Sequence, residues 1–428
     1  MESRKQTIRF YLALVIFSLV GQVAWVVENM YFNVFIYNMF RATPSDISAM
    51  VAASAVAAAV TTVLMGALSD RLGRRKAFIC GGYILWGITI FAFTFLREDI
   101  VGGLFPMAAS VSALCVTLTI ILDCVMTFFG STANDAAFNA WLTDSTDASN
   151  RGAAEGINAM MPLVAILAVF GGFMFVDLSG EAGWQTVFTV IGGVVILVGV
   201  LGIFLIREPE IRPSETGCLG NIIYGFRPST VRANARLYLY LAAFAVFNIS
   251  IQIFMPYLII YYEKSLGMAD YVLIMAPAVI LASVFTALWG KMYDRRGFRF
   301  SAAVAVLCLM AGYVLLYLTR GRLPVFLGSL LMMCGYLAGM AVFGAVIRDH
   351  TPVGMAGRFQ GLRIVFQVLI PGFVGPAIGA WVLRNAEYIT NSDGTTSFLP
   401  NANIFLAALV AAAVLMPLFI RRSGKTSQ

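Results

Sequence analysis

The chain has 428 residues, of which 60% are hydrophobic and 12% charged, and its formal net charge is +7. Soluble domains carry about twice that charged fraction, which excludes an ordinary soluble globular protein. The apolar residues form runs of about 20, long enough to cross a hydrocarbon core of roughly 30 Å as helix. Backbone groups in lipid need internal partners, and the runs lack the alternation of barrel strands, so we expect an all-α polytopic membrane protein.

The apolar runs predict twelve membrane-spanning helices. Taken in chain order, they cover residues 10–38, 45–68, 77–96, 116–142, 153–176, 184–206, 236–262, 269–290, 300–319, 324–347, 360–384 and 402–420. The longest polar connection separates the first six spans from the last six. We therefore predict an N-terminal six-helix bundle at 1–206, a cytoplasmic central loop at 207–235 and a C-terminal six-helix bundle at 236–428.

The distribution of basic residues predicts the orientation. With both termini in the cytoplasm, most of the 29 Lys and Arg residues fall in cytoplasmic segments, as the positive-inside rule requires. The net positive charge then faces the anionic inner leaflet of the cell membrane, and no nucleic-acid partner is needed to explain it. The six cysteines form no C-x-x-C pair and His350 is the single histidine, so we expect no metal site and no cofactor.

A compact basic loop, "GALSDRLGRRKAF", lies between the second and third spans and contains Asp70, Arg71 and Arg74. A second copy, "GKMYDRRGFRF", lies between the eighth and ninth spans and contains Asp294 and Arg295. No strand precedes either copy and the P-loop pattern is missing, which argues against phosphate binding. Two six-helix halves with the same loop in the same place form a parallel repeat, which is a transporter architecture.

The loop resembles the G-x-x-x-D-R-x-G-R-[RK] signature of the major facilitator superfamily, and the resemblance extends over the whole chain. It implies a transporter that works by alternating access and is not an enzyme. It also implies a cytoplasmic gate, in which charged loop residues pair while the protein is open outward. The implied gate residues are Asp70, Arg71, Arg74, Arg151, Asp294, Arg295 and Arg358. The alternative for the arginines is that they only anchor the topology.

Acidic residues inside the spans are the candidates for cation coupling. A charge in mid-bilayer costs at least ~2.5–3.5 kcal/mol, so such residues are functional by default. Glu28 lies well inside the first span, and Asp135 lies about 12 Å from the cytoplasmic end of the fourth, at 1.5 Å per residue. Either could bind a proton or Na⁺, and the sequence leaves the two ions open. Asp123 lies further out on the same span, where we expect it to contact water.

The resemblance also implies which polar residues line the substrate cavity, because spans 1, 4, 7 and 10, with 5, 8 and 11, surround it in the major facilitator fold. The candidates on these spans are Trp25, Asn29, Asn134, Asn139, Asn248, Gln252, Tyr257 and Gln367. For any single amide, the alternative is a hydrogen bond between helices, worth about 0.6 kcal/mol. For the aromatic residues, it is helix packing or an interfacial belt.

The stretch "NDAAFNAWLTDSTDASNRG" resembles the fourth span and following loop of the glycoside–pentoside–hexuronide cation symporters, the melibiose-permease-like branch. This implies a monomeric symporter of a small polar solute such as a sugar or glycoside. That branch carries acids on the second span, and this chain has none there, which leaves the solute and the ion open. Two alternatives are a proton-coupled drug or metabolite exporter and a non-transporting membrane sensor. The fifth span lacks the Gly-Pro of the exporters, and the retained carboxylates argue against the sensor.

Overall fold

The computed structural model describes residues 2–147, 150–208, 225–352, 356–391 and 394–420. The chain divides into two compact units. Unit 1 comprises Met1–Asn221 together with Thr390–Ser397, and unit 2 comprises Ile222–Ile389 together with Phe398–Gln428. The division falls inside the segment predicted as the central loop, of which residues 209–224 lie outside the described part of the chain.

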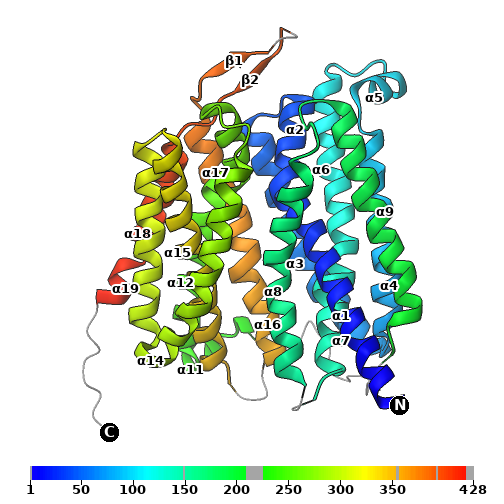
Figure 1. Cartoon of the computed structure of the whole chain (residues 1–428), viewed down its shortest axis with the longest axis vertical. Coiled ribbons are helices and arrows are strands. Elements are labelled where there is room, and N and C mark those ends of the chain that lie inside the picture. The colour runs from blue at the N-terminus through cyan, green and yellow to red at the C-terminus, as the bar shows by residue number, and fades with distance from the viewer. Residues whose placement is uncertain (1, 148–149, 209–224, 353–355, 392–393, 421–428) are drawn as a thin grey trace. The chain divides into compact units, whose positions relative to one another are not determined.

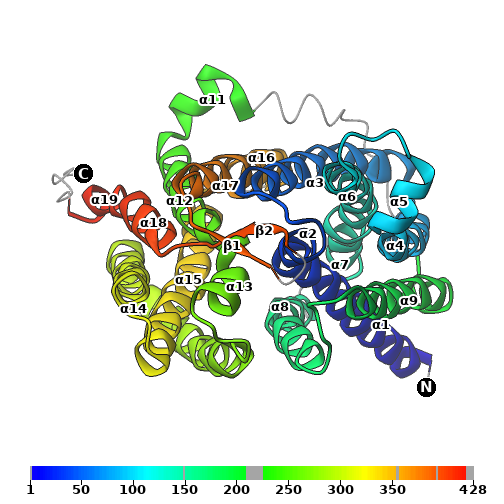
Figure 2. The ribbon, with the colours of Figure 1, turned by 90° about the horizontal axis from the view of Figure 1, so that it is seen from above.

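Unit 1 is a helical bundle (Figure 1). Its elements are α1 Glu2–Val26, η1 Val27–Tyr31, α2 Phe32–Phe40, α3 Pro44–Leu72, α4 Arg75–Ala92, η2 Phe93–Phe95, α5 Glu98–Leu104, α6 Val111–Gly130, η3 Ser131–Phe138, α7 Asn139–Asp144, α8 Arg151–Phe173 and α9 Glu181–Leu205. The helix pairs α4–α9, α1–α8 and α3–α6 pack against each other, as the end-on view in Figure 2 shows. The short helix α5 lies between the third and fourth predicted spans, in a segment for which no helix was predicted.

A short hairpin that the sequence did not predict is divided between the two units, since Thr390–Ser397 belong to unit 1. Unit 2 is otherwise built from helices. Its elements are α11 Pro228–Ala233, α12 Ala235–Phe254, η4 Met255–Tyr257, α13 Leu258–Ile260, η5 Tyr261–Ser265, α14 Val272–Leu318, α15 Arg322–His350, α16 Ala356–Ile364, η6 Val365–Leu369, α17 Ile370–Leu383, α18 Asn403–Ala413 and α19 Met416–Ile420. Strands β1 (Tyr388–Thr390) and β2 (Thr396–Phe398) pair with each other between α17 and α18. Helix α14 packs on α15, and α12 packs on α17 and α18.

The long helices of the structure lie where the sequence predicted membrane spans. Among the described residues, ten helices are long and apolar enough to cross a membrane, and a shorter apolar helix covers Asn403–Phe419. One of the ten, α14, covers nearly all of the eighth and ninth predicted spans, and Gly297 interrupts it between them. The all-helical polytopic fold is therefore confirmed.

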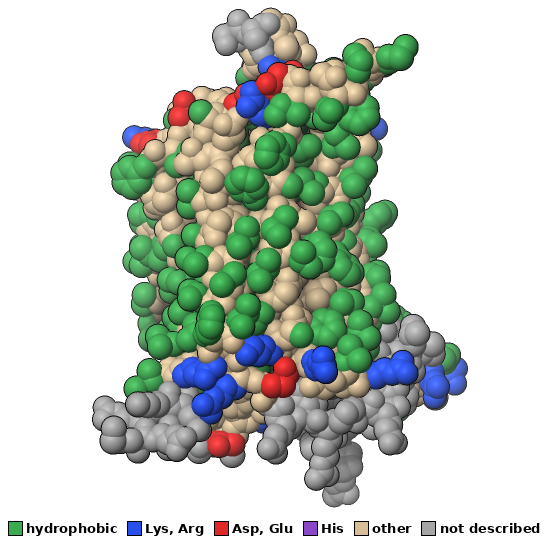
Figure 3. All heavy atoms as spheres, turned by 90° about the vertical axis from the view of Figure 1, so that its right-hand side faces the viewer, with side chains coloured by type: hydrophobic (Ala, Val, Ile, Leu, Met, Phe, Trp, Pro, Cys, Tyr) green, Lys and Arg blue, Asp and Glu red, His purple; other side chains and the backbone are tan. Residues whose placement is uncertain are grey.

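Helix α9 shows how the spans divide their surface between neighbours and lipid. Its small residues approach α4 closely: a Cβ atom on Gly192 would lie 2.9 Å from the Gly87 carbonyl oxygen, and one on Gly199 would lie 2.8 Å from atoms of Ile84. Small residues allow this backbone approach in membrane helix pairs. Other α9 side chains are exposed, including Phe204, which is 70% exposed. Figure 3 shows one face of the molecule with a band of hydrophobic side chains and charged side chains toward its two ends, as a membrane-spanning protein requires.

The duplicated loop has a glycine with positive φ at one aligned position in each copy. Gly73 ends α3 with φ 61°, and Gly297, which aligns with it, interrupts α14 with φ 73° and ψ 179°. Both values lie in the region that residues with a Cβ atom rarely adopt. The glycine of each copy is therefore needed for the chain to turn from one span into the next.

We expect Gly297→Ala to lower the free energy of unfolding by about 1–3 kcal/mol, because alanine is strained at this φ and ψ. Gly290→Ala is the matched control in the same loop copy, since a Cβ atom there would meet nothing within 4 Å and its φ is not positive. It should be neutral or stabilise by up to about 1 kcal/mol. Thermal unfolding of the purified protein in detergent measures both, and equal effects would contradict the assigned backbone strain.

Candidate functional site

Glu28 is held in the interior of unit 1 by two hydroxyl groups from neighbouring spans. Ser54 of α3 donates to its Oε1 atom at 2.7 Å, and Thr127 of α6 donates to the same atom at 2.9 Å. The hydroxyl oxygens of Ser54 and Thr127 are 2.9 Å apart. The other carboxyl oxygen, Oε2, is buried and has no hydrogen-bond partner among the described residues. Three spans thus converge on one carboxyl group.

Both candidate coupling acids lie in π-helical segments. Glu28 is in η1, and Asp135 is in η3. A π-helical turn closes its hydrogen bonds one residue later than an α-helical turn, and such segments within α-helices are frequent at functional sites. Each span continues as α-helix on both sides. The sequence contains no breaker that marks these segments, and helical periodicity alone predicts uninterrupted α-helix there.

Asp135 lies beside Trp25 on a partly accessible face of unit 1. Ser131 donates to its Oδ2 atom at 3.0 Å, and the side chain is half-buried. The Trp25 indole nitrogen is close to this carboxyl group but makes no hydrogen bond with it. One turn beyond each residue lies an exposed amide: Asn29 donates to the Trp25 carbonyl at 2.8 Å, and Asn139 donates to the Asp135 carbonyl at 3.2 Å. The structure therefore brings these four predicted residues close to one another.

Asn134 has a different environment from the one predicted for a cavity residue. Its side chain is buried and donates to the Tyr83 hydroxyl at 2.8 Å, and Tyr83 donates to the Phe17 carbonyl at 2.6 Å. A Cβ atom on Gly21 would lie 2.2 Å from the Asn134 amide nitrogen, so α1 also packs closely there. Because α1, η3 and α4 meet at this amide, the structure shows it in a hydrogen bond between helices.

The four polar candidates of unit 2 have separate environments. Asn248 is buried and donates to the Phe244 carbonyl of its own helix at 2.9 Å, and the Tyr257 side chain is fully buried. Gln252 is half-buried where α17 approaches α12, and a Cβ atom on Gly375 would lie 2.4 Å from its Cβ atom. Gln367, in the π-helical segment η6, accepts a hydrogen bond from Arg363 at 3.0 Å.

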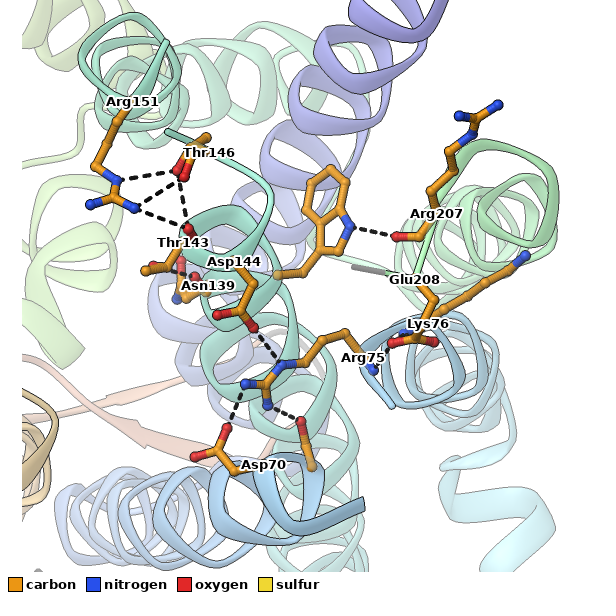
Figure 4. Close-up of polar contacts among 12 residues, drawn as sticks. Asp70, Arg75, Lys76, Asn139, Thr143, Asp144, Thr146, Arg151, Arg207 and Glu208 are labelled. Carbon is orange, nitrogen blue, oxygen red and sulfur yellow. Dashed lines mark hydrogen bonds and ion pairs between the residues drawn. The ribbon is translucent and has the colours of Figure 1, made fainter. Parts of the chain in front are cut away.

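The loop between α3 and α4 of unit 1 is organised by Arg75, which the sequence analysis missed (Figure 4). Its guanidinium group contacts Asp70 at 2.5 Å, Asp144 at 3.0 Å and the Ser69 hydroxyl at 2.5 Å. Its backbone N–H also donates to a Glu208 carboxyl oxygen. Arg75 is buried, whereas the Asp70 side chain is 49% exposed. We call Ser69, Asp70, Arg75 and Asp144 the Arg75 network; it ties the end of α3 to α4 and α7.

The predicted gate arginines of unit 1 lie around this network. Arg71 and Arg74 are exposed, and neither forms an ion pair with another residue that the structure describes. Arg151 donates to the Thr143 and Thr146 carbonyl oxygens at 3.3 and 3.1 Å, just after α7. A cation at the carbonyl end of a helix is stabilised by the helix dipole. Sequence spacing alone could not separate Arg75 from its basic neighbours, since all lie within one short cluster.

The second loop copy lacks a counterpart of the Arg75 network among the described residues. Tyr293, which aligns with Ser69, donates to Asp349 at 2.5 Å. Asp294 and Arg295 are exposed, with no ion pair in the described part of the chain. The Arg358 side chain lies outside what the structure describes. The two copies thus share a glycine with positive φ but differ in their polar contacts.

The helices are long enough to span a membrane and enclose carboxyl groups, and the same loop occurs at the same place in each predicted half. These features define the class of polytopic membrane transporters. The family model described as the Major Facilitator Superfamily matches residues 11–376. The chain therefore belongs to the Major Facilitator Superfamily. It is a multi-pass membrane protein and a secondary transporter of small-molecule solutes rather than an enzyme.

Solved structures show the same fold. The nucleoside transporter NupG is 14% identical with a TM-score of 0.69, over 96% of this chain and 99% of that one. The D-xylose-proton symporter is 14% identical with a TM-score of 0.68, over 97% and 100% of the two chains. A bacterial homologue of the human lysosomal transporter Spinster is 17% identical with a TM-score of 0.63, over 88% and 81%. Comparison with curated proteins gave no match.

Proposed function

We propose that the protein is a cation-coupled symporter that takes up a small polar solute, such as a sugar or glycoside, by alternating access. The observation that carries the proposal is the half-buried Asp135 carboxyl group beside the Trp25 indole, with exposed amides at Asn29 and Asn139. An aromatic surface next to a few convergent polar groups suits a ring with hydroxyl substituents. In this proposal, Asp135 and Glu28 carry the coupling cation, H⁺ or Na⁺.

The predicted solute-contact residues occur in both units. In the first half, Trp25, Asn29 and Asn139 have accessible polar or aromatic groups. In the second half, Gln252 and Gln367 are the half-buried candidates. Two of the structural neighbours are described as a nucleoside transporter and a D-xylose-proton symporter. Nucleosides and D-xylose contain rings with hydroxyl groups, so transporters of this fold include ones for solutes of the kind proposed.

The exposed loop charges support the gate proposal. Asp294, Arg295, Arg71 and Arg74 have no ion pair among the described residues, so each is available for a partner in another conformation. We place this gate, with Arg151 and Arg358, on the cytoplasmic side of the cell membrane. Both termini would lie on that side, in agreement with the basic loops. The transport unit would be the monomer, because each chain carries both halves of the repeat.

Transport by the purified protein in proteoliposomes tests the proposal. A thermal-shift screen of sugars, glycosides and nucleosides would first identify a solute. We expect an inward gradient of H⁺ or Na⁺ to drive accumulation of that solute above equilibrium, and dissipation of the gradient to abolish accumulation. An exporter would instead release preloaded solute when protons are supplied from the opposite side. Binding without any transport would identify a sensor and contradict the proposal.

A further inference from the structure

Asp123 is a second buried acid beside Glu28, in a place where the sequence predicted contact with water. It lies on α6, one turn before Thr127, and only 2% of the residue is exposed. Its Oδ1 atom is buried and has no hydrogen-bond partner among the described residues, as is the case for Glu28 Oε2. Two carboxyl groups therefore each retain one oxygen atom that the surrounding protein does not satisfy.

In the part of the chain that the structure describes, the two acids have no cationic partner. Glu28 and Asp123 are close enough to act on each other electrostatically, and Asp135 is the further charged group that acts on Glu28. Ser54 donates to Glu28 Oε1 and also lies beside Asp123. Among the described residues, no Lys or Arg forms an ion pair with either acid. Two adjacent carboxylates in a low-dielectric interior cannot both remain ionised without such a partner.

We propose that Glu28 and Asp123 form an acid pair that holds one exchangeable proton. The two hydroxyl bonds to Glu28 Oε1 stabilise the ionised form of Glu28, so the proton resides on Asp123 and exchanges with Glu28. The oxygens free to take it are Asp123 Oδ1 and Glu28 Oε2. The role of the pair in coupling rests on the proposed function, and it identifies the coupling ion at this site as H⁺. The acid pair itself does not depend on which solute is carried.

Infrared spectroscopy of the purified protein in detergent tests the pair directly, because a protonated carboxyl group has a C=O stretching band that a carboxylate lacks. We expect such a band at neutral pH, lost in Asp123→Asn. In Glu28→Gln it should change in frequency, since the neighbouring carboxylate is gone. Glu155→Gln removes an exposed acid of the same unit and should leave the band unchanged. A band that is identical in the wild type and both pair variants would overturn the proposal.

Two further measurements keep the test decisive if a pair variant folds poorly. Ser54→Ala removes one of the hydroxyl donors to Glu28, so it should shift the frequency of the band without removing a carboxyl group. Addition of NaCl should leave the band in place. Loss of the band on adding Na⁺, but not on adding the larger choline cation, would show that the pair binds Na⁺ and would contradict a shared proton.

Failure of the acid pair and failure of the proposed function can be distinguished by experiment. The band is measured without solute or transport, so a protein that proves not to be a symporter can still show the acid pair. Asp135→Asn should leave the band of the pair present, because both acids of the pair remain, and should shift its frequency, because a charged group that acts on Glu28 is removed. Conversely, symport that persists while the band is absent would reject the pair and retain the proposed function.

Discussion

Replacing Asp135 with Asn is expected to abolish accumulation of the solute against its gradient. The substitution preserves the size of the side chain and an oxygen that can accept the hydrogen bond from Ser131, whose Oγ atom lies 3.0 Å from Asp135 Oδ2 in the native protein. It removes the negative charge that the coupling cation requires. We expect the rate of gradient-driven uptake to fall by at least about 100-fold, or about 2.7 kcal/mol. Uptake by proteoliposomes under an imposed H⁺ or Na⁺ gradient measures this loss.

Two controls separate loss of coupling from loss of structure. Glu155→Gln removes an exposed carboxyl group from α8 of the same unit, and it should transport at the wild-type rate. Solute binding, followed by thermal shift, should be weakened less in Asp135→Asn than accumulation is. Accumulation at the wild-type rate in Asp135→Asn would exclude this carboxyl group as the coupling site.

Replacing Arg75 with Gln should produce the largest loss of stability among the loop charges. The guanidinium group contacts Asp70, Asp144 and Ser69 at once, and glutamine can neither reach all three nor neutralise the acids. Leaving the buried Ser69 hydroxyl and the partly buried Asp144 carboxyl group without this partner costs about 1–3 kcal/mol. Asp70 is half-exposed, so water will replace part of its contact. The measurement is the midpoint of thermal unfolding in detergent, which should fall by several degrees.

Arg71→Gln is the matched control for Arg75→Gln. Arg71 lies four residues earlier in the same loop copy, carries the same charge and is exposed, with no ion pair among the described residues. It should change the unfolding midpoint little, because exposed charges contribute about 0–1 kcal/mol. If transport requires a gate, this variant should affect transport more than stability. Equal destabilisation by both substitutions would show that net loop charge, rather than the Arg75 network, determines stability.

Much of the fold follows from local properties of the sequence. Runs of apolar residues predict the spans because lipid forces the backbone to satisfy its own hydrogen bonds. The two loop copies predict a repeat, and Gly73 and Gly297 show positive φ at aligned positions. The acids of the spans also stand out from sequence alone, because a carboxyl group within an apolar run is rare and costly.

The partners of those residues depend on contacts between distant segments. Helical spacing cannot show that Asn134 faces Tyr83 while Asp135, the next residue, lies beside Trp25. The π-helical segments change the direction of side chains within a span, so a regular 3.6-residue period assigns some of them to the wrong face. The hairpin of β1 and β2 is too short to produce a clear alternating pattern.

The sequence by itself determined the class of protein, its spans, its repeated loop and the acids worth testing, because composition and periodicity report the solvent that each segment meets. Only the tertiary structure decided that Arg75, rather than Arg71 or Arg74, holds Asp70 and Asp144. The burial of Asp123 near Glu28 is likewise evident only from the tertiary structure. The reason is physical: the environment of a charge is set by helices far apart in the chain, and no local pattern encodes how those helices pack.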